Sequence, residues 1–382
     1  MKIELNREIL VKKLATVLSV INEGHALPVL GSALFEFKDS RIHITGSDLE
    51  LTIKTSMEYD LVEGEELNFV IEPSVLMKTI QTLKADIIWI DFSPAEKMVY
   101  FGTKSTRKKY QVPSQTNAKD FPLPKSEETV ESIEISGANI SKAISVCARF
   151  TNKADLRPAF TGVNLRSKEG KLQMFGTNAN VIAMFEFDSL QDFSETIIPR
   201  NIAKVVMEFK DSVTVTMSKG KTGSALFLSD GNISVSISLV DAKFLEFDKI
   251  FAQVNMDVTV IFPRVEVLEA IKRSSGFQNA TSKTVVLDFT SNENQMSIKA
   301  ENTDFNKAST EEIEYVSKED FFNYRTGFNS DFISSILSIL EGENIVFSQI
   351  DYKTTAVLRD DKDKGYKSLF ALGPLQILGN NN

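Results

Sequence analysis

The 382-residue sequence contains a single cysteine, Cys147, and two histidines, His25 and His43. One cysteine excludes an internal disulfide framework and a cysteine-based zinc site. The two histidines fall in different segments, which argues against a metal site or a histidine-based catalytic group. No apolar run approaches the ~18 residues that span a bilayer. Acidic residues interrupt the N-terminal "MKIELNREIL", where a signal peptide would be apolar. We therefore expect a cytoplasmic protein that uses no metal or cofactor.

The sequence also lacks a recognisable catalytic constellation. Carboxylates are frequent, but no pair stands out as an acid and base couple. The stretch "SKGKTGSA" (218–225) resembles the end of a phosphate-binding loop, yet the glycine required five residues before Gly220 is replaced by Val215. Because the stretch separates two segments of alternating apolar and polar residues, it predicts a hairpin turn. We predict a protein that is not an enzyme, with a nucleotide-binding enzyme as the weaker alternative.

What the sequence does contain is a repeat. Residues 27–48, "LPVLGSALFEFKDSRIHITGSD", align without a gap with residues 157–178, "RPAFTGVNLRSKEGKLQMFGTN". Pro28 falls on Pro158, and Gly46 falls on Gly176. A third version, "KTVVLDFTSNENQMSIKAENTD", ends at Asp304, about twice the same spacing after Asp48. Three repeats of similar length therefore fill the chain, and we place them at 1–127, 128–254 and 255–382.

Each repeat has the same order of predicted elements. An amphipathic helical pattern opens each third, at 6–21, 138–153 and 263–276, and a second one follows about 65 residues later, at 73–84, 199–210 and 329–341. In the first segment Asn6 is the expected N-cap, and Ile9, Leu10, Leu14 and Val17 lie on one apolar stripe. Alternating segments between the helices predict strands. The fold class is therefore α+β, with three tandem similar repeats.

Charge is distributed unevenly along the chain. The six helical segments together carry a net charge of +8, whereas the whole chain carries −9, so the remainder carries −17. Lysines on the polar face of an amphipathic helix are usually only solvated, and this is the simplest interpretation. The alternative is a basic helical surface that contacts nucleic acid through phosphate groups, independently of base sequence.

The helix "NREILVKKLATVLSVI" and the stretches "LPVLGSALFEFKDSRIHITGSDLEL", "IIPRNIAKVVMEF", "SISLVDAKF" and "GFNSDFISSIL" occur in this order along the chain. In this respect the sequence resembles the β subunit of bacterial DNA polymerase III, the replicative sliding clamp, over residues 1 to about 377. The resemblance implies the DNA clamp fold in a head-to-tail homodimeric ring, with helices lining a pore around duplex DNA and antiparallel sheets outside. A ring of similar wedges gives the repeat a physical reason.

The resemblance also implies where DNA and partner proteins bind. The basic residues expected in the pore are Lys12, Lys13, Lys78, Lys142, Arg149, Lys153, Arg200, Lys204 and Arg273. Replicative polymerase, clamp loader and repair proteins are expected to insert short peptides into an apolar cleft between the second and third repeats. Carried over from the family, its wall comprises Phe160, Thr177, Ala179, Val181, Ile182, Leu245, Ile250, Asn329, Phe332, Leu372, Pro374 and Leu375.

The chain departs from the family pattern around this cleft. After Thr177 the family usually has Asp-Gly-His-Arg, whereas this chain has "NANV", and the tail "LGPLQILGNNN" keeps a proline but lacks the usual methionines and arginine. An arginine that often precedes the Pro28 region is also absent. These changes predict altered peptide subsites and one fewer DNA contact.

The dimer contact of the family maps onto "TRKKYQVP" (106–113) in repeat one and onto the region after the first helix of repeat three. The residues expected there are Arg107, Lys109, Tyr110, Phe277, Glu311 and Glu312, with opposite charges facing each other. Two alternatives remain within this interpretation: a clamp dedicated to a repair or mobile-element polymerase, and a three-repeat scaffold that binds proteins without encircling DNA.

Overall fold

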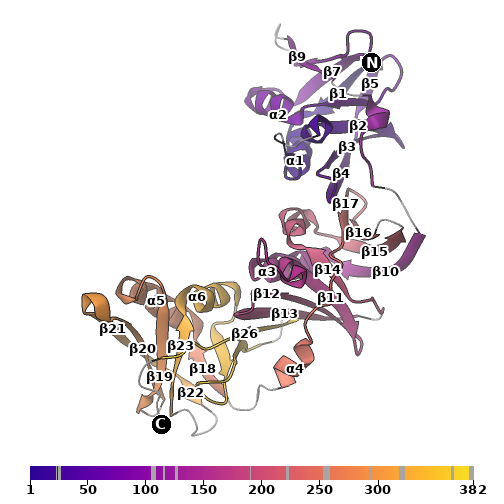
Figure 1. Cartoon of the computed structure of the whole chain (residues 1–382). Helices are drawn as coiled ribbons and strands as arrows, with labels where there is room; N and C mark the ends of the chain where they lie inside the picture. The colour runs from indigo at the N-terminus through magenta and orange to yellow at the C-terminus, as the bar shows by residue number, and fades with distance from the viewer. Residues whose placement is uncertain are drawn as a thin grey trace. The chain divides into compact units, whose positions relative to one another are not determined.

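The structure is a computed structural model that describes residues 1–22, 24, 27–104, 109–114, 117–124, 128–189, 191–220, 223–252, 259–292, 294–317, 323–362 and 365–377. Its contacts divide the chain into two compact units (Figure 1). The first comprises residues 1–145 and 198–241, and the second comprises residues 146–197 and 242–382. Within the described ranges, no helix is long and apolar enough to cross a membrane.

Two antiparallel sheets form the first unit. The smaller has the order β5 (Asp60–Glu63), β1 (Lys2–Asn6), β7 (Ile87–Ser93), β8 (Met98–Gly102), β9 (Lys109–Pro113). The larger has the order β10 (Glu128–Ser136), β15 (Ser212–Gly220), β16 (Gly223–Ser229), β17 (Ile233–Ser238), β4 (Leu51–Met57), β3 (Arg41–Ser47), β2 (Ala33–Lys38), β6 (Phe69–Ile71).

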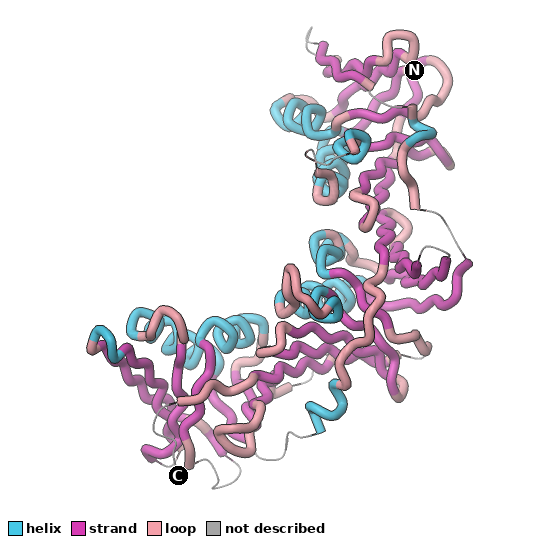
Figure 2. Tube along the Cα trace, in the orientation of Figure 1, coloured by secondary structure: helices cyan, strands magenta, loops and turns pink. Residues whose placement is uncertain are grey.

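The second unit is also built on two sheets. The nine-stranded sheet has the order β14 (Thr196–Pro199), β11 (Gly162–Lys168), β12 (Lys171–Thr177), β13 (Val181–Asp188), β26 (Lys367–Leu372), β25 (Ala356–Asp360), β24 (Asn344–Ser348), β18 (Thr259–Pro263), β22 (Val316–Ser317). The four-stranded sheet has the order β21 (Lys307–Glu314), β20 (Gln295–Asn302), β19 (Thr284–Asn292), β23 (Arg325–Asn329). Strands dominate the chain (Figure 2), and the predicted α+β class is confirmed.

The helices are short and pack on the sheets. They are α1 (Arg7–Leu18), α2 (Pro73–Thr82), α3 (Gly137–Arg149), α4 (Phe247–Ala252), α5 (Arg264–Ser274) and α6 (Ser330–Ile339). Single 3₁₀ turns are η1 (Pro28–Gly31), η2 (Ala118–Asp120), η3 (Pro158–Thr161), η4 (Arg200–Lys204), η5 (Val206–Glu208), η6 (Ser275–Phe277) and η7 (Thr303–Phe305). Helices α1 and α2 pack against each other in the first unit, as α5 and α6 do in the second.

Helix α1 begins and packs largely as its sequence predicts. The side chain of Asn6 accepts a hydrogen bond from the backbone N–H of Ile9 at 3.0 Å, so Asn6 is the N-cap. Leu10, Leu14 and Val17 are fully buried. Ile9 is 44% exposed, so the prediction that it belongs to the buried apolar stripe is wrong. It lies in the first turn of the helix, where its side chain lines a pocket.

The segment 199–210 does not form the predicted α-helix. It consists of the two 3₁₀ turns η4 and η5, which meet at Val205. Pro199 at the N-cap position offers no side-chain hydrogen bond to the first turn. β-Branched residues such as Val205 and Val206 also have low helix propensity, because their side chains crowd the preceding turn. The apolar spacing of this segment was therefore read correctly as a buried face but wrongly as a continuous helix.

The Pro-rich and acidic stretch 121–132, whose composition is typical of a linker, is partly structured. Residues 125–127 lie outside the described residues, and β10 already begins at Glu128, where it pairs antiparallel with β15. Ile133 and Ile135 alternate with exposed Glu134 and Ser136 along β10. This period of two is typical of a strand with one buried face.

Strand pairs join consecutive thirds of the chain into continuous sheets. Strand β4 pairs with β17, and β13 pairs with β26. The division into two compact units therefore falls within the middle third of the chain and not between two thirds. The repeat boundaries at 127/128 and 254/255 stay a prediction.

Close packing of helix on sheet explains the glycine shared by the first two copies of the repeat. A Cβ added to Gly46 would lie 2.7 Å from Cγ1 of Val17, and one added to Gly176 would lie 2.1 Å from the carbonyl oxygen of Cys147. Only glycine permits the backbone to approach the helix so closely at these positions. Cys147 itself is buried, and burial raises the pKa of its thiol. Cys147 is therefore a core residue.

Candidate functional site

The nine predicted DNA contacts come from four helices, one 3₁₀ turn and one loop. Exposed positions carry Lys12 on α1, Lys78 on α2, Arg149 at the end of α3, Lys153 just after it, and Lys204 on η4. Lys13, Lys142 and Arg200 are half-buried. The accessible cations can reach phosphate groups, but their assignment to DNA stays a prediction.

Two of these cations are already engaged by carboxylates. Lys12 Nζ lies 2.9 Å from Glu8, one turn earlier on α1. The guanidinium of Arg273 holds both carboxylate oxygens of Glu311, with the shortest contact at 2.6 Å, and also lies 3.6 Å from Glu269. Arg273 lowers the pKa of Glu311, which keeps that partner ionised. Arg273 therefore offers less net positive charge than the sequence predicts.

The predicted peptide cleft lies entirely in the second unit, and its inner wall is made by paired strands. Val181 on β13 lies opposite Leu372 on β26, and the backbone N–H of Gly373 donates to the carbonyl of Asn180 at 2.9 Å. Val181 and Leu372 are fully buried, so they belong to the core beneath the predicted cleft and present no surface to a peptide. Ile182 is half-buried on the same strand.

The divergent "NANV" sequence forms a compact turn at this wall. The hydroxyl of Thr177 donates to the carbonyl of Val181 at 2.7 Å and accepts from the N–H of Ala179 at 3.1 Å. The side chain of Asn178 accepts from the N–H groups of Asn180 and Val181. Ala179, exposed with φ of +75°, stands at the tip. Buried side-chain hydrogen bonds thus fix the turn.

The opposite wall comprises α6 and the C-terminal tail. Asn329 caps α6 by accepting from the N–H groups of Asp331 and Phe332, which places half-buried Phe332 in the first turn. Leu375 donates its N–H to the carbonyl of Gly327 at 2.7 Å, so the tail that contains Pro374 runs alongside β23. The structure therefore brings the predicted tail residues next to both β13 and β23.

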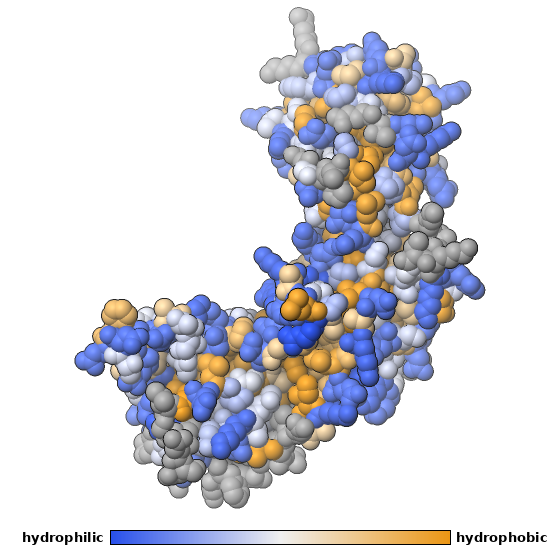
Figure 3. Space-filling model, in the orientation of Figure 1, coloured by the Kyte–Doolittle hydropathy of each residue, from blue (hydrophilic) through white to orange (hydrophobic). Residues whose placement is uncertain are grey.

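Leu245 and Ile250 belong to a segment that is anchored onto β12. The ring of Phe247 stacks on Phe175 with centroids 4.4 Å apart, and Asp248 forms ion pairs with Arg166 and Lys168. The ion pairs hold the pKa of Asp248 below its usual range. Leu245 and Ile250 remain half-buried beside this anchor. The space-filling view shows apolar surface gathered where α4 lies (Figure 3).

Two residues near this groove were missed at the sequence level. The guanidinium of Arg157 lies 3.8 Å above the ring of Phe160, which is itself buried, and Arg157 is held by Asp155 at 3.1 Å. Leu156 between them is fully exposed. An exposed leucine beside an arginine and an aromatic ring matches the chemistry of a peptide-binding surface. The sequence signal that could have found them is the stretch "DLRPAF", in which Leu156 directly precedes the repeated segment that begins at Arg157.

Four of the six predicted dimer residues lie on two outermost strands. Lys109 and Tyr110 are on β9, where the Lys109 ammonium lies 3.6 Å over the Tyr100 ring and half-buried Tyr110 stacks on Phe101. Glu311 and exposed Glu312 are on β21, and Phe277, in η6, is 40% exposed. Arg107 lies outside the described residues.

The described part of the chain has no side-chain cluster typical of a metal site. No cluster of three or more His, Cys, Asp or Glu side chains there could hold a metal ion. The sequence around Gly220 joins β15 to β16, which pair antiparallel from Gly220 and Gly223 outward, so the predicted hairpin is confirmed. Its tip, Lys221 and Thr222, lies outside the described residues.

Known proteins resemble the chain over nearly its whole length. Residues 1–124 match the family model for the N-terminal domain of the DNA polymerase III beta subunit. The beta sliding clamp of Pseudomonas aeruginosa is 24% identical over 96% of this chain and 98% of its own length. A beta sliding clamp homolog, GriR, from Streptomyces muensis is 22% identical over 94% of this chain and 93% of its own.

Solved structures show the same fold. The crystal structure of a Pseudomonas aeruginosa sliding clamp bound to griselimycin covers 99% of this chain and 100% of that one, with 22% identity and a TM-score of 0.87. The DNA polymerase III beta subunit from Thermotoga maritima covers 98% and 99%, with 19% identity and a TM-score of 0.84. The family model over residues 1–124, the full-length relatives and the shared fold agree, and the chain resembles the beta sliding clamps, the beta subunits of bacterial DNA polymerase III, over nearly its whole length.

Proposed function

We propose that this chain is a DNA polymerase processivity factor, a clamp that closes as a head-to-tail homodimer around duplex DNA. The observation that carries the proposal concerns the two sheets that join strands of consecutive repeats. In each of these sheets, a row of directly opposed residues runs across the strands from one repeat to the next. One row is Ile133, Val215, Leu228, Val235, Ile53, and the equivalent row is Val260, Phe347, Leu358, Phe370, Ala183. In both rows the last residue is the third residue of a strand from the preceding repeat.

The corresponding row of the first repeat is incomplete within one chain. It runs Ile3, Ile90, Phe101, Tyr110 and stops, because β9 is the outermost strand of its sheet. The strand equivalent to β4 and β13 is β21, which is outermost in its own sheet, and its third residue is Ser309. A second copy of the chain would complete the row by placing its Ser309 opposite Tyr110.

Local chemistry supports this completion. The buried Oγ of Ser309 has no hydrogen-bond partner among the described residues. Lys109 would lie diagonally across from Glu312, within the reach of a long side chain. Both strands expose backbone groups that β-strand addition would satisfy. Each subunit carries one copy of each edge, so two subunits can close without leaving an edge unpaired.

DNA contact is proposed for the basic helical surface. Six of the nine predicted cations are exposed: five lie on or next to α1, α2, α3 and η4, and the sixth is Arg273 on α5. Phosphate contacts are independent of sequence and exchange readily, which suits a ring that slides. Because Arg273 is neutralised by Glu311, we expect most of the attraction to come from the first two repeats.

Partner binding is proposed for the groove between β13, α4, α6 and the tail. Its half-buried apolar side chains suit short peptides with leucine or phenylalanine anchors, donated by polymerase, clamp loader or repair proteins. The chain itself would perform no chemistry and would act in the cytoplasm. A clamp dedicated to a repair or mobile-element polymerase would share every feature named here, except for the partner peptide.

The scaffold alternative makes a different prediction about assembly. A processivity clamp must be a closed dimer at low micromolar concentration, whereas a scaffold that never encircles DNA needs no closed ring. The mass in solution, measured by light scattering or sedimentation, is expected to be twice 42.6 kDa. A purely monomeric protein would contradict the clamp.

A further inference from the structure

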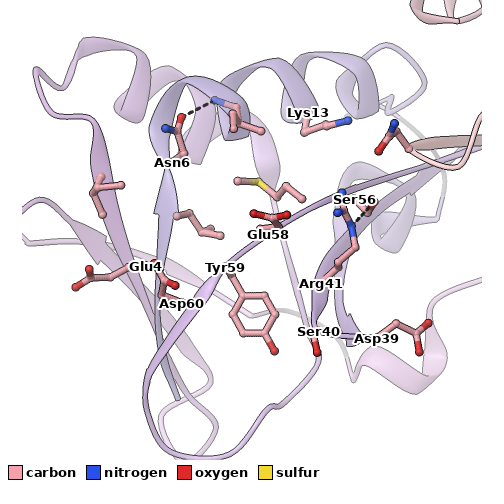
Figure 4. Close-up of a pocket in the computed structure, with 15 residues that line it drawn as sticks. Glu4, Asn6, Lys13, Asp39, Ser40, Arg41, Ser56, Glu58, Tyr59 and Asp60 are labelled. Atoms are coloured by element: carbon pink, nitrogen blue, oxygen red, sulfur yellow. Dashed lines mark hydrogen bonds between the residues drawn. The ribbon is translucent and has the colours of Figure 1, made fainter. Parts of the chain in front are cut away.

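A pocket of about 930 Å³ opens at the end of α1 in the first unit. Its walls come from β1 and α1, the turn between β2 and β3, the end of β4, and Asn232 just ahead of β17. The labelled side chains of Lys13 and Arg41 lie at one side, and those of Glu4 and Asp60 at the other (Figure 4). Asp39 lies near Arg41 and Glu58 lies between the two sides, so charges of both signs line the pocket.

Lys13 lines the pocket without a counterion. Its ammonium makes no hydrogen bond or ion pair with any residue that the structure describes, although half of the side chain is buried. Burial is the main reason that the pKa of Lys13 is lowered, and the nearby Arg41 lowers it further. A desolvated cation beside a second cation attracts an anion.

Arg41 supplies the second cation in an oriented form. Its Nε donates to the hydroxyl of Ser56 at 3.1 Å, which leaves the terminal nitrogens of the guanidinium uninvolved in that bond. Fork-shaped guanidinium donors match the oxygens of a phosphate group. The amide of Asn232 lines the same pocket and can add a neutral donor.

Four carboxylates line the pocket, those of Glu4, Asp39, Glu58 and Asp60, but none of them forms an ion pair with Lys13 or Arg41. Glu4 is bound by Lys104 at 2.7 Å, and no described carboxylate lies within ion-pair distance of Lys13 or Arg41. The acidic groups that act on Lys13 are Asp230 and Glu208, which do not line the pocket.

The equivalent places in the other repeats lack the pair. The seventh residue of the opening helix is Lys13 in α1 but buried Ala143 in α3 and buried Ala270 in α5. The first strand residue after the turn is Arg41 in β3, Lys171 in β12 and Gln295 in β20. Lys171 is ion-paired with Asp188.

The third repeat has a pocket at this same place, of about 560 Å³, which is lined by Glu266 and Glu314 and by no lysine or arginine. The first repeat alone thus places an uncompensated lysine where the other two bury alanine. An unpaired, partly desolvated cation is unfavourable for folding and is retained where it serves binding.

We propose that Lys13 and Arg41 form a phosphate-binding site, specific to the first repeat, that holds one phosphate group of the DNA backbone. This inference deepens the proposed function, on which it rests, by giving one repeat an exchangeable phosphate contact that the other two lack. Free phosphate shares the chemistry and can occupy the same site.

The test follows the accessibility of the Lys13 amine in the full-length protein. An amine-reactive reagent is applied at constant ionic strength with chloride, inorganic phosphate, pyrophosphate or a short DNA duplex, and labelling of the Lys13 peptide is measured by mass spectrometry. Labelling should slow about twofold when the ligand concentration equals its dissociation constant. Arg41→Gln should remove this protection, and Lys171→Gln, the same charge change in repeat two, should keep it.

The three anions separate the possible sources of the phosphate. Protection by inorganic phosphate, pyrophosphate and DNA alike supports the site and shows that a phosphate group is sufficient for binding. Protection by DNA only supports the site and assigns it to the backbone of the duplex. If none slows labelling beyond the chloride control, the proposal is overturned.

A second measurement separates binding from structure. Lys13→Ala should unfold at the same or a higher denaturant concentration than the wild type, while losing affinity for DNA. A marked loss of stability instead would show that Lys13 is structural. Retention of the protein on circular DNA is measured independently of both results. If the protein is retained on circular DNA but the Lys13 amine is not protected from labelling, only this inference is refuted. Protection at Lys13 without retention refutes only the proposed function.

Discussion

The guanidinium of Arg273 on α5 and the carboxylate of Glu311 on β21 form a bidentate ion pair, with nitrogen–oxygen distances from 2.6 to 3.2 Å. The sequence predicts separate roles for them, one toward DNA and the other toward a second subunit. The structure shows that each is already bound to the other, 38 positions apart in the chain. Their charges cancel at short range, which weakens both predicted roles.

This ion pair predicts an unequal contribution of cations to DNA binding. Arg273→Gln should change the salt dependence of duplex binding little, because Glu311 already neutralises the guanidinium. Lys204→Gln, at an exposed position, should reduce the slope of log affinity against log salt by about 1. Glu311→Gln should raise affinity by freeing Arg273. Titration of a labelled duplex at several salt concentrations checks all three, and equal slope losses for Arg273→Gln and Lys204→Gln would refute the interpretation.

The incomplete residue row predicts the register between subunits. Tyr110→Cys combined with Ser309→Cys should form an intersubunit disulfide on mild oxidation, because opposed residues in neighbouring strands have Cβ atoms about 4.5–5.5 Å apart. Buried Cys147 should not compete. Tyr110→Cys with Thr310→Cys is the matched control, since a shift by one residue turns the side chain to the other face. Covalent dimers are detected on non-reducing gels, and equal yields from both pairs would reject this register.

The two repeat-related glycines should differ in their tolerance of alanine. At Gly46 the added methyl group meets the side chain of Val17, which can move, but at Gly176 it meets the backbone of Cys147. Gly176→Ala should therefore destabilise by at least the ~1–3 kcal/mol that is usual for overpacking, and Gly46→Ala by less. Denaturant unfolding gives both values. The reverse order would mean that the helix above Gly176 shifts freely.

The predicted peptide groove can be tested with two variants and one control. Phe332→Ala should weaken binding of a polymerase-derived peptide at least about tenfold, or ~1.4 kcal/mol, by removing an apolar anchor. Leu375→Asp should abolish it by placing an unpaired charge at a half-buried site. Phe305→Ala, which removes a 72% exposed ring elsewhere in the second unit, should have no effect. Unchanged affinity in both groove variants would place peptide binding elsewhere.

The divergent sequence "NANV" and the altered tail predict different subsites within this groove. Peptides from typical clamp partners should bind more weakly than peptides from the organism's own polymerase, because the usual methionines and arginine are missing. A competition titration compares the two classes. Equal affinities would show that the fixed turn at Thr177 leaves the subsites unchanged.

Sequence reasoning succeeded where local patterns decide the structure. The N-cap at Asn6, the buried face of α1 and the hairpin after Gly220 follow from residues that are close in the chain. It failed at 199–210, because a buried apolar spacing is compatible with 3₁₀ turns as well as with an α-helix. The sequence also did not reveal contacts between residues that are far apart in the chain, such as the ion pair between Arg273 and Glu311. Arg41 was missed because only the fold places it beside Lys13.

Retention on DNA of different topology tests the central claim most directly. The protein is loaded onto nicked circular DNA by its clamp loader, and half of the sample is linearised before gel filtration at moderate salt. A closed ring held by topology should stay with the circular DNA and run off the linear DNA, because phosphate contacts alone are weak and exchange rapidly. Equal retention on both forms, or on neither, would contradict the account of this chain as a sliding clamp.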